Sequence, residues 1–486
     1  MSDKLYKGWE IVIGLEVHAQ ISSKSKLFSR SPANFGADPN TNVSLYDAAL
    51  PGQLPVLNNF CIEQAVKTGI AIDGTINKIS VFDRKNYFYP DLPSGYQISQ
   101  LYHPIVTNGK IVIEEEFGEK TINIERIHIE QDAGKSIHDL SPNETYIDLN
   151  RSGVPLMEIV SQPDMRSSSE AMQYVKKLRM ILRYVGTCDC NMEKGNIRFD
   201  ANVSIHKPGT PFGTRTEIKN INSIKFLGFA IDYEVERQVS LLEIGGKVVQ
   251  ETRLFDPNTG ETKSMRSKED AADYRYFPDP DLKPITLTDE FIKRIRNNMP
   301  ELPDAKKKRF IDIYALNIYD ANILIEDIDV ANKFEEAVNA SRFASTNSPK
   351  LIANWMISEV FAVLNKEGKS INELDFPIIY IAEMVDLIID GTISGKIAKT
   401  VLNEMFTTKR KPADIVQDMG LSQISDETII REVVEKVLKN NQEKVKEYKS
   451  GKDKLFGFFV GVTMKELAGK GNPEKINKII KEVLGY

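Results

Sequence analysis

The stretch EIVIGLEVHAQ, residues 10–20, alternates apolar and polar side chains with the two-residue period of a half-buried β-strand. The apolar side chains on one face are those of Ile11, Ile13, Leu15, Val17 and Ala19. Glu16 and His18 lie on the other face with Gly14, where the missing side chain lets another backbone come close. Two interpretations of Glu16 and His18 are open. They face solvent, as polar faces of antiparallel strands commonly do, or they form half of a metal site.

A second predicted strand, within residues 121–132, carries a similar polar face. The polar side chains on this face are those of Arg126, His128, Glu130 and Asp132. They alternate with Ile127 and Ile129, which we expect in the core. The preceding Ile122 and Ile124 have the opposite phase, so the sequence predicts a β-bulge near Glu125 that re-aims the strand.

Three more segments extend this pattern. The segment NIRFDANVSI, residues 196–205, places on one face Arg198, Asp200, Asn202 and Ser204. The segment TRTEIKN, residues 214–220, alternates in the same way and presents Arg215, Glu217 and Lys219. The third segment, GVPLMEIV (residues 153–160), holds Glu158 in an otherwise apolar run, where an unpaired carboxylate would cost several kcal/mol.

The residue types on these faces indicate a common site. Carboxylate, imidazole and guanidinium groups are the side chains that hold a metal ion and a phosphate together, so we predict a shared metal and polyanion site. Carboxylates with one imidazole favour Mg²⁺ or Mn²⁺, although Zn²⁺ is also compatible. The alternative for the strand cations and acids is an internal network of salt bridges, formed by Arg198, Asp200, Glu217 and Lys219.

The loop VFDRKNYFYPDLPSGYQISQ, residues 81–100, combines cations with aromatic side chains. Arg84 and Lys85 are followed by aromatic residues at positions 87, 88, 89 and 96, and two prolines and a glycine bend the chain. Such a loop can stack a base while its cations contact phosphates. The alternative is an aromatic-rich loop with a structural role.

The composition is that of an ordinary soluble protein of two to four domains, with 486 residues, 41% hydrophobic and 27% charged. We expect no membrane span and no signal peptide, because no apolar run of about 18 residues exists and the first residues are charged. The three cysteines predict a reducing, cytoplasmic location, with Cys188 and Cys190 as structural thiols. The net charge is −6, but residues 436–486 contain 12 lysines and 6 acids, so this tail could meet nucleic acid or simply be solvated.

The order of the elements predicts an α+β fold with largely antiparallel pairing. Helices are expected within residues 167–186 and 222–246, and FDPNTGETKSM, residues 255–265, is expected to form a hairpin. After FPDPDLKPI, residues 277–285, the pattern becomes helical, and a second break lies near residues 407–414. We therefore expect a mostly antiparallel β domain at 1–292, a helical domain at 293–408 and a helical tail domain at 409–486.

Several long motifs together resemble the B-subunit family of the tRNA-dependent amidotransferases. The motifs are GLEVHAQ, FDRKNYFYPDLPSGYQISQ, HIEQDAGKS, DLNRSGVPLMEIVSQPD, RFDANVSI, TEIKNINSI and DYRYFPDPDL. The resemblance runs from about Ile11 to the C-terminus in the same order. It implies a cradle domain similar to glutamine synthetase and guanido kinases, followed by a helical domain and a tail that help to hold tRNA.

The resemblance also implies an activity. Family members act on Glu or Asp mischarged onto tRNA(Gln) or tRNA(Asn), as ligases that form a C–N bond with glutamine as amido donor. ATP activates the side-chain carboxylate as an acyl phosphate, and ammonia from a separate amidase, the A subunit, displaces the phosphate. A small C subunit completes a heterotrimer. The alternative is a tRNA-docking scaffold whose catalysis resides elsewhere.

Matching positions suggest which residues carry this chemistry. The expected Mg²⁺ ligands are Glu16, His18, Glu130 and Glu158, and with Lys85 they form the expected catalytic set. Phosphate contacts are expected from Lys85 and Arg84, and further contacts to ATP or the acyl phosphate from Arg198, Asp200, Glu217 and Lys219. Two departures from the family stand out. The stretch SLYDAALPGQLPVLN, residues 44–58, lacks the cysteines of a zinc site, so no zinc is expected, and Gln131 stands where relatives have a second acid.

Overall fold

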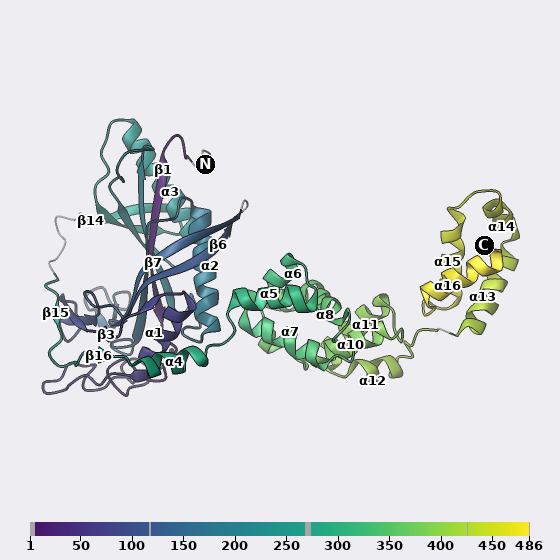
Figure 1. Ribbon diagram of the computed structural model, residues 1–486, viewed down its shortest axis with the longest axis horizontal. Helices are drawn as coiled ribbons and strands as arrows, with labels where there is room; N and C mark the ends of the chain where they lie inside the picture. The colour runs from purple at the N-terminus through teal and green to yellow at the C-terminus, as the bar shows by residue number, and fades with distance from the viewer. Residues whose placement is uncertain (1–4, 116–117, 268–273, 425, 486) are drawn as a thin grey trace. The chain divides into compact units, whose positions relative to one another are not determined.

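The computed structural model describes residues 5–115, 118–267, 274–424 and 426–485. Its contacts divide the chain into two compact units, Met1–Pro303 and Asp304–Tyr486. The first unit combines a large sheet with helices, and the described part of the second unit is helical (Figure 1). The fold is therefore α+β, as the sequence predicts.

Within the described residues, nine strands form the large sheet. Their spatial order is β14 (Glu261–Ser267), β13 (Glu251–Asp256), β12 (Thr216–Ile221), β11 (Ile197–His206), β1 (Glu10–Gln20), β10 (Pro155–Ser161), β7 (Gly118–Gln131), β6 (Val106–Glu115) and β2 (Thr75–Ile76). Neighbouring strands pair antiparallel except β12 and β13, which run parallel because a helix connects them. β13 and β14 form the expected hairpin.

The opening stretch of the sequence is the central strand of this sheet. β1 pairs with β11 on one side and with β10 on the other. Ile13, Leu15 and Val17 are buried in the core, and Glu16 and His18 are half-buried on the opposite face. The alternation read from the sequence is therefore confirmed.

The predicted bulge in β7 is also confirmed. Arg126 lies opposite Val160 of β10, and Ile124 lies opposite Ser161 of the same strand. Glu125 therefore has no opposing residue on β10. The extra residue reconciles the two phases, because Ile124 and Ile127 are both buried.

Three helices pack against the apolar face of the sheet. They are α1 (Asn59–Ala71), α2 (Ser168–Tyr184) and α3 (Ile224–Glu243). The hydroxyl oxygens of Ser167 and Ser223 accept hydrogen bonds from the first turns of α2 and α3, which fixes where these helices begin. Both of these helices were expected from the sequence and are confirmed. Cys188 and Cys190 are free thiols buried in the same core.

Smaller sheets attach long loops to the edge of the polar face. β15 (Phe277–Pro278) pairs with β4 (Asp83–Asn86), which pairs with β5 (Tyr96–Ser99). β16 (Ile285–Thr286) pairs with β3 (Ile79–Ser80), and β8 (Lys135–Ile137) pairs with β9 (Tyr146–Asp148). As a result, the cationic loop at 81–100 lies beside the segment around Phe277, although the two are far apart in the sequence.

The division between the units lies at Pro303, later than the expected boundary at residue 292. The reason is helix α4 (Asp289–Asn297), which packs against α1. Phe291, Ile292 and Ile295 of α4 join the core under the large sheet. This helix therefore belongs to the first unit.

The second unit consists of helices in the described residues. In chain order they are α5 (Pro303–Tyr314), α6 (Ile318–Ile325), α7 (Ile328–Ala340), α8 (Ser348–Trp355), the π-helix η2 (Met356–Val360), α9 (Phe361–Glu367), the 3₁₀-helix η3 (Ile371–Glu373), α10 (Ile379–Ile389), α11 (Gly395–Thr408), α12 (Pro412–Asp418), α13 (Glu427–Asn440), α14 (Gln442–Lys449), α15 (Leu455–Glu466) and α16 (Pro473–Leu484).

The last four helices have a core of their own. Ile430 and Val434 of α13 pack with Phe459 of α15 and Ile480 of α16. α12 instead contacts α10 and α11, so it lies with the helices that precede the expected boundary at residue 408. No helix in the described part of the chain has the length and apolar character needed to cross a membrane.

Candidate active site

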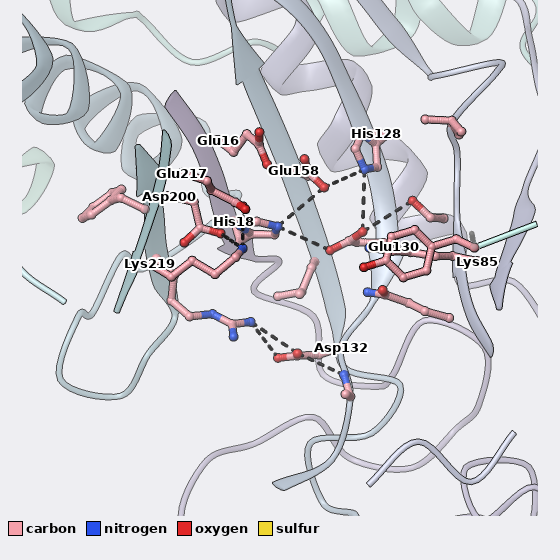
Figure 2. Close-up of a pocket in the computed structure, with 18 of the residues that line it drawn as sticks. Glu16, His18, Lys85, His128, Glu130, Asp132, Glu158, Asp200, Glu217 and Lys219 are labelled. Atoms are coloured by element: carbon pink, nitrogen blue, oxygen red, sulfur yellow. Dashed lines mark hydrogen bonds and ion pairs between the residues drawn. The ribbon is translucent and has the colours of Figure 1, made fainter. Parts of the chain in front are cut away.

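The polar face of the large sheet forms the floor of one cavity of about 780 Å³ (Figure 2). Strands β1, β7, β10, β11 and β12 contribute side chains that alternate with the buried core residues. The expected site residues that line this cavity are Glu16, His18, Lys85, Glu130, Glu158, Arg198, Asp200, Glu217 and Lys219. The sheet therefore brings together side chains from segments that are far apart in the sequence.

Strand register explains why the central side chains meet. Arg198 lies opposite His18, His18 lies opposite Glu158, and Glu158 lies opposite His128. This row of four side chains crosses β11, β1, β10 and β7, and all of them line the cavity. Glu130, two residues after His128 on β7, joins the row from the side.

The centre of the cavity holds two carboxylates and two imidazoles. The Nε2 atom of His128 lies 2.9 Å from a carboxylate oxygen of Glu158, and His18 Nε2 lies 3.5 Å from the same oxygen. Glu130 lies 3.7 Å from His18 Nε2 and 3.6 Å from His128 Nε2. The two histidines therefore bridge the two carboxylates.

The protonation of this cluster follows from burial and charge. Burial opposes the charged form of His18, but hydrogen bonding and attraction from Glu158 and Glu130 outweigh it and raise the pKa of His18 to about 9. Against the same effect of burial, Glu158 and Glu130 raise the pKa of His128 to about 9. Burial also disfavours ionised Glu158, but His128 and His18 hold the pKa of that carboxyl well below its usual range. The surrounding carboxylates thus favour the charged form of both imidazoles.

Three of these residues fit a metal ion. His18, Glu130 and Glu158 each offer one ligand atom, and these atoms lie within 4.8 Å of one another. Two carboxylates and one imidazole are compatible with a hard divalent cation, which would replace the proton charge of the histidines. Glu16 lines the same cavity, where its Oε1 atom accepts a hydrogen bond of 2.9 Å from Asn202, and it lies outside this group of ligand atoms. The structure therefore brings together three of the four expected ligands.

The cations of the cavity differ in how they are neutralised. Lys219 Nζ lies 2.8 Å from Asp200 and 2.8 Å from Glu217, and against its burial these two carboxylates raise the pKa of Lys219. Lys85 Nζ instead lies 4.8 Å from the ring centre of Tyr274, and no carboxylate of the described residues forms an ion pair with it. Among the described residues, the Lys85 side chain therefore contacts aromatic rings and lines the cavity.

Comparison with known proteins identifies the family. Residues 11–293 match the GatB/GatE catalytic domain, and residues 332–484 match the GatB domain. The chain is 56% identical to the B subunit of the aspartyl/glutamyl-tRNA(Asn/Gln) amidotransferase of Pelagibacter ubique, over 98% of this chain and 96% of that protein. The B subunit of the Zymomonas mobilis enzyme is 55% identical over 98% of this chain and 97% of its own length. For Rickettsia bellii the identity is 55%, with 98% of each chain covered.

The chain belongs to the amidotransferase B-subunit family. The residues of the cavity described above fall within the span that matches the GatB/GatE catalytic domain. The family resemblance inferred from the sequence motifs is therefore confirmed.

One expected phosphate contact in this family member, Arg84, does not line the cavity. Arg84 and Lys85 are neighbours on β4 and therefore point to opposite faces of that strand. The Arg84 guanidinium donates hydrogen bonds of 2.8 Å to Asp279 and 2.9 Å to Asp281 and lies over the ring of Tyr96. These contacts anchor β4 to the segment after β15.

Gln131 also points away from the cluster. Its side-chain nitrogen donates to the backbone oxygen of Tyr96, at 3.4 Å, and it lines a separate pocket of about 260 Å³. Because neighbouring residues of a strand alternate between faces, Glu130 rather than Gln131 supplies the oxygen atom near His18.

Several residues that line the cavity were not among the site residues expected from the sequence. They are His128, Asp132, Tyr87, Tyr274 and Tyr276. His128 had a usable signal, since it alternates with Glu130 on the predicted polar face. Tyr274 and Tyr276 precede the short strand β15, and the pairing of β15 with β4 brings them to the cavity. No periodic pattern in the sequence predicts this pairing.

Proposed function

We propose that this protein makes Gln-tRNA(Gln) or Asn-tRNA(Asn) from tRNA mischarged with Glu or Asp. It would act as a ligase that forms a C–N bond, with ATP as co-substrate and glutamine as amido donor. The observation that carries this proposal is the row Arg198–His18–Glu158–His128 with Glu130, in one cavity beside Lys85. Family membership supports the same overall role.

The proposed chemistry matches what the cavity offers. A carboxylate is a poor acyl donor, so the side chain of the mischarged amino acid must first be phosphorylated by ATP. Phosphoryl transfer depends on positioning and charge neutralisation more than on a covalent protein nucleophile. His18, Glu130 and Glu158 would hold Mg²⁺, or alternatively Mn²⁺, and the ion would supply positive charge that neutralises phosphate.

The protein's own cations would then hold the phosphate groups. Lys85 lines the cavity without a carboxylate partner among the described residues, so its ammonium is the first candidate for a phosphate contact. Arg198 is the second, because it lies next to His18 in the row. Lys219 is held by Asp200 and Glu217, so it would order those two carboxylates rather than bind the substrate.

The remaining steps call for partners. Ammonia would come from an amidase, the A subunit, with a small C subunit completing a heterotrimer, and it would displace the phosphate from the activated carboxyl group. We place the first unit among cradle domains similar to glutamine synthetase and guanido kinases, and the reaction in the cytoplasm. The lysines of α13 to α16 would contact the tRNA, since residues 436–486 carry 12 lysines and 6 acids.

The decisive experiment uses the assembled complex without any ammonia donor. ATP labelled in the γ-phosphate is incubated with tRNA(Gln) mischarged with Glu, and transfer of the label to the tRNA is followed. We expect label on the tRNA with the wild-type protein and almost none with Glu158→Gln. Asp386→Asn, which alters a buried acid of the helical unit, serves as the control and should transfer normally.

If Glu158→Gln transfers the label as fast as the wild type, the cavity is not the site of activation. The protein would then be a docking scaffold whose catalysis resides elsewhere. Purified by itself, the chain should also fail to hydrolyse glutamine, because in this proposal the amidase partner produces the ammonia.

A further inference from the structure

We infer that Asp132 is a positioning residue that holds the Arg198 guanidinium in one orientation toward the reacting phosphate. This inference rests on the proposed function, because it assigns Arg198 a phosphate to bind. Asp132 would not contact the substrate itself. Its effect would pass through Arg198 alone.

The contacts of Asp132 provide the first support. Both of its carboxylate oxygens accept from a single nitrogen of Arg198, Nη2, at 3.3 Å and 3.1 Å. Asp132 is itself fixed, because its backbone N–H donates to Val154 at 2.8 Å and its carbonyl accepts from Gly153 at 2.9 Å. The carboxylate is nearly buried, with 8% of the residue exposed. An arginine held by a rigid, buried carboxylate loses much of its rotational freedom.

The second support is what Arg198 leaves unused. Its Nε and Nη1 atoms form no hydrogen bond with the described residues, although the side chain lines the cavity. A guanidinium that is held through one nitrogen still presents donors on another edge, which suits a phosphate oxygen. The register places this arginine directly opposite His18, next to the cation ligands.

Local charge gives the third support. Asp132 also accepts from the Nε atom of Arg151, whose Nη2 donates to the backbone of Gly195 at 3.0 Å. One carboxylate therefore lies between two guanidinium groups, and the group keeps a net positive charge. Lys219 shows the opposite balance, one ammonium between Asp200 and Glu217. Asp200 and Glu130 also attract the Arg198 guanidinium, but of these two groups the one around Asp132 has the balance of charge that suits an anion.

The end of strand β7 connects Asp132 to the proposed cation site. Glu130 and Asp132 lie two residues apart and both line the cavity, so one stretch of chain supplies a cation ligand and the group that holds Arg198. The backbone thereby sets the spacing between a residue that would hold the cation and the residue that holds the guanidinium.

The test separates binding from positioning in the assembled complex. Asp132→Asn keeps the shape of the side chain and one acceptor oxygen but removes its charge. We expect the KM for ATP to change by less than about threefold, since both arginines remain, while kcat for phosphoryl transfer to mischarged tRNA falls about tenfold to a hundredfold. A merely structural role would lower thermal stability and leave the rate per folded enzyme unchanged.

A double-mutant cycle decides whether Asp132 acts through Arg198. If it does, Asp132→Asn in the Arg198→Ala background should cause no further loss of kcat. Additive losses would overturn the inference. Asp386→Asn, a buried acid that accepts from Arg342 in the other unit, is the matched control and should leave both constants unchanged.

Arg198→Lys keeps the proposal testable if Asp132→Asn does not fold. A lysine keeps the charge but, once held by Asp132, has no second nitrogen for the phosphate, so kcat should fall while the KM for ATP stays similar. A wild-type kcat would overturn the inference. If the wild-type complex transfers no phosphate at all, the proposed function fails. If the wild type transfers and Asp132→Asn transfers equally fast, only the role of Asp132 fails.

Discussion

Two clusters of buried charge lie on opposite faces of the large sheet. On the helix face, Glu234 of α3 accepts from Thr216 at 2.7 Å, from Gln238 at 2.9 Å and from Arg237 at 2.6 Å. Arg253 forms an ion pair with it at 3.4 Å. On the cavity face, Glu130 and Glu158 are balanced by two histidines.

The partners make these clusters different in kind. Arginines keep their charge at every accessible pH and hold Glu234 permanently, so this cluster is complete without a ligand. Histidines can lose their protons, so the charge that balances Glu130 and Glu158 can be exchanged for that of a metal ion. Buried charge with permanent partners therefore indicates structure, and buried charge with exchangeable partners indicates a binding site.

The largest expected effect breaks the cavity cluster. Glu158→Ala should lower the rate of ATP-dependent amidation on the order of 10³-fold or more, because the cation would lose a carboxylate ligand. The unfolding temperature should change little, since His18 and His128 can lose their protons when their partner is removed. Steady-state amidation and thermal unfolding measure the two effects, and an activity within tenfold of wild type would contradict the assignment.

The corresponding change in the Glu234 cluster should have the opposite effects, lowering stability and leaving activity unchanged. Glu234→Gln should lower the free energy of unfolding of the first unit by about 3 kcal/mol, because it leaves Arg237 without its buried counter-charge and Arg253 with Glu251 alone. The kcat per folded enzyme should stay the same. Asp256→Asn, which breaks the exposed pair with Lys263, is the control and should change the free energy of urea unfolding far less than Glu234→Gln does.

Acid titration tests the same residue. Burial disfavours ionised Glu234, but Arg237, Gln238 and Thr216 outweigh it and lower its pKa below the usual 4.5. Its contribution to stability is therefore present above pH 4.5 and is lost as the pH falls through the lower pKa of the folded state. Glu234→Gln should flatten the decline in stability over this range. An unchanged decline would show that other groups govern acid unfolding.

Lys85 and Arg84, neighbouring cations on β4, allow the same comparison between binding and structural roles. Lys85→Ala should weaken ATP binding about tenfold to a hundredfold, because its ammonium has no carboxylate partner in the described residues and lines the cavity. Arg84→Ala should instead lower stability with little change in ATP affinity, since it pairs with Asp279 and Asp281. Calorimetric titration with a non-hydrolysable ATP analogue measures both. Equal losses of ATP affinity in the two variants would contradict the different roles assigned to Lys85 and Arg84.

The smallest effect concerns the tail. Lys446 and Lys449 of α14 are exposed, and replacing both with alanine should weaken tRNA binding a few-fold at low salt. The slope of log affinity against log salt should fall by about two, one for each lost phosphate contact. Lys263→Ala, an exposed lysine of the first unit, is the control. An unchanged slope would mean that these lysines are ordinary solvated surface.

Much of the fold could be predicted because it depends on local patterns. The alternation in residues 10–20, the phase change near Glu125 and the serines that begin α2 and α3 are all visible in the sequence. These features depend on side-chain periodicity and capping, which act within a few residues. The packing of α4 on α1 could not be predicted, because it joins segments that are far apart in the sequence.

The site was predictable to the extent that it follows from strand faces. His18, Glu130 and Glu158 meet because strand alternation and register bring them to the same part of the sheet. Which cations have a carboxylate partner was not predictable. Lys85 and Lys219 look alike in sequence, and only the positions of Asp200 and Glu217 distinguish them.

The bulge at Glu125 has a consequence for protein engineering. Because the stretches on either side already bury their isoleucines on the same side, deleting Glu125 would restore regular alternation along β7 against β10. On the other edge the register with β6 runs through Glu125 without a shift, so the deletion would leave Asn108 of β6 as the extra residue and would move the bend from one edge of β7 to the other. The deletion would keep every side chain of the site and change their orientation. Comparing the activity of this variant with that of the wild type would therefore show how far catalysis depends on the curvature of β7.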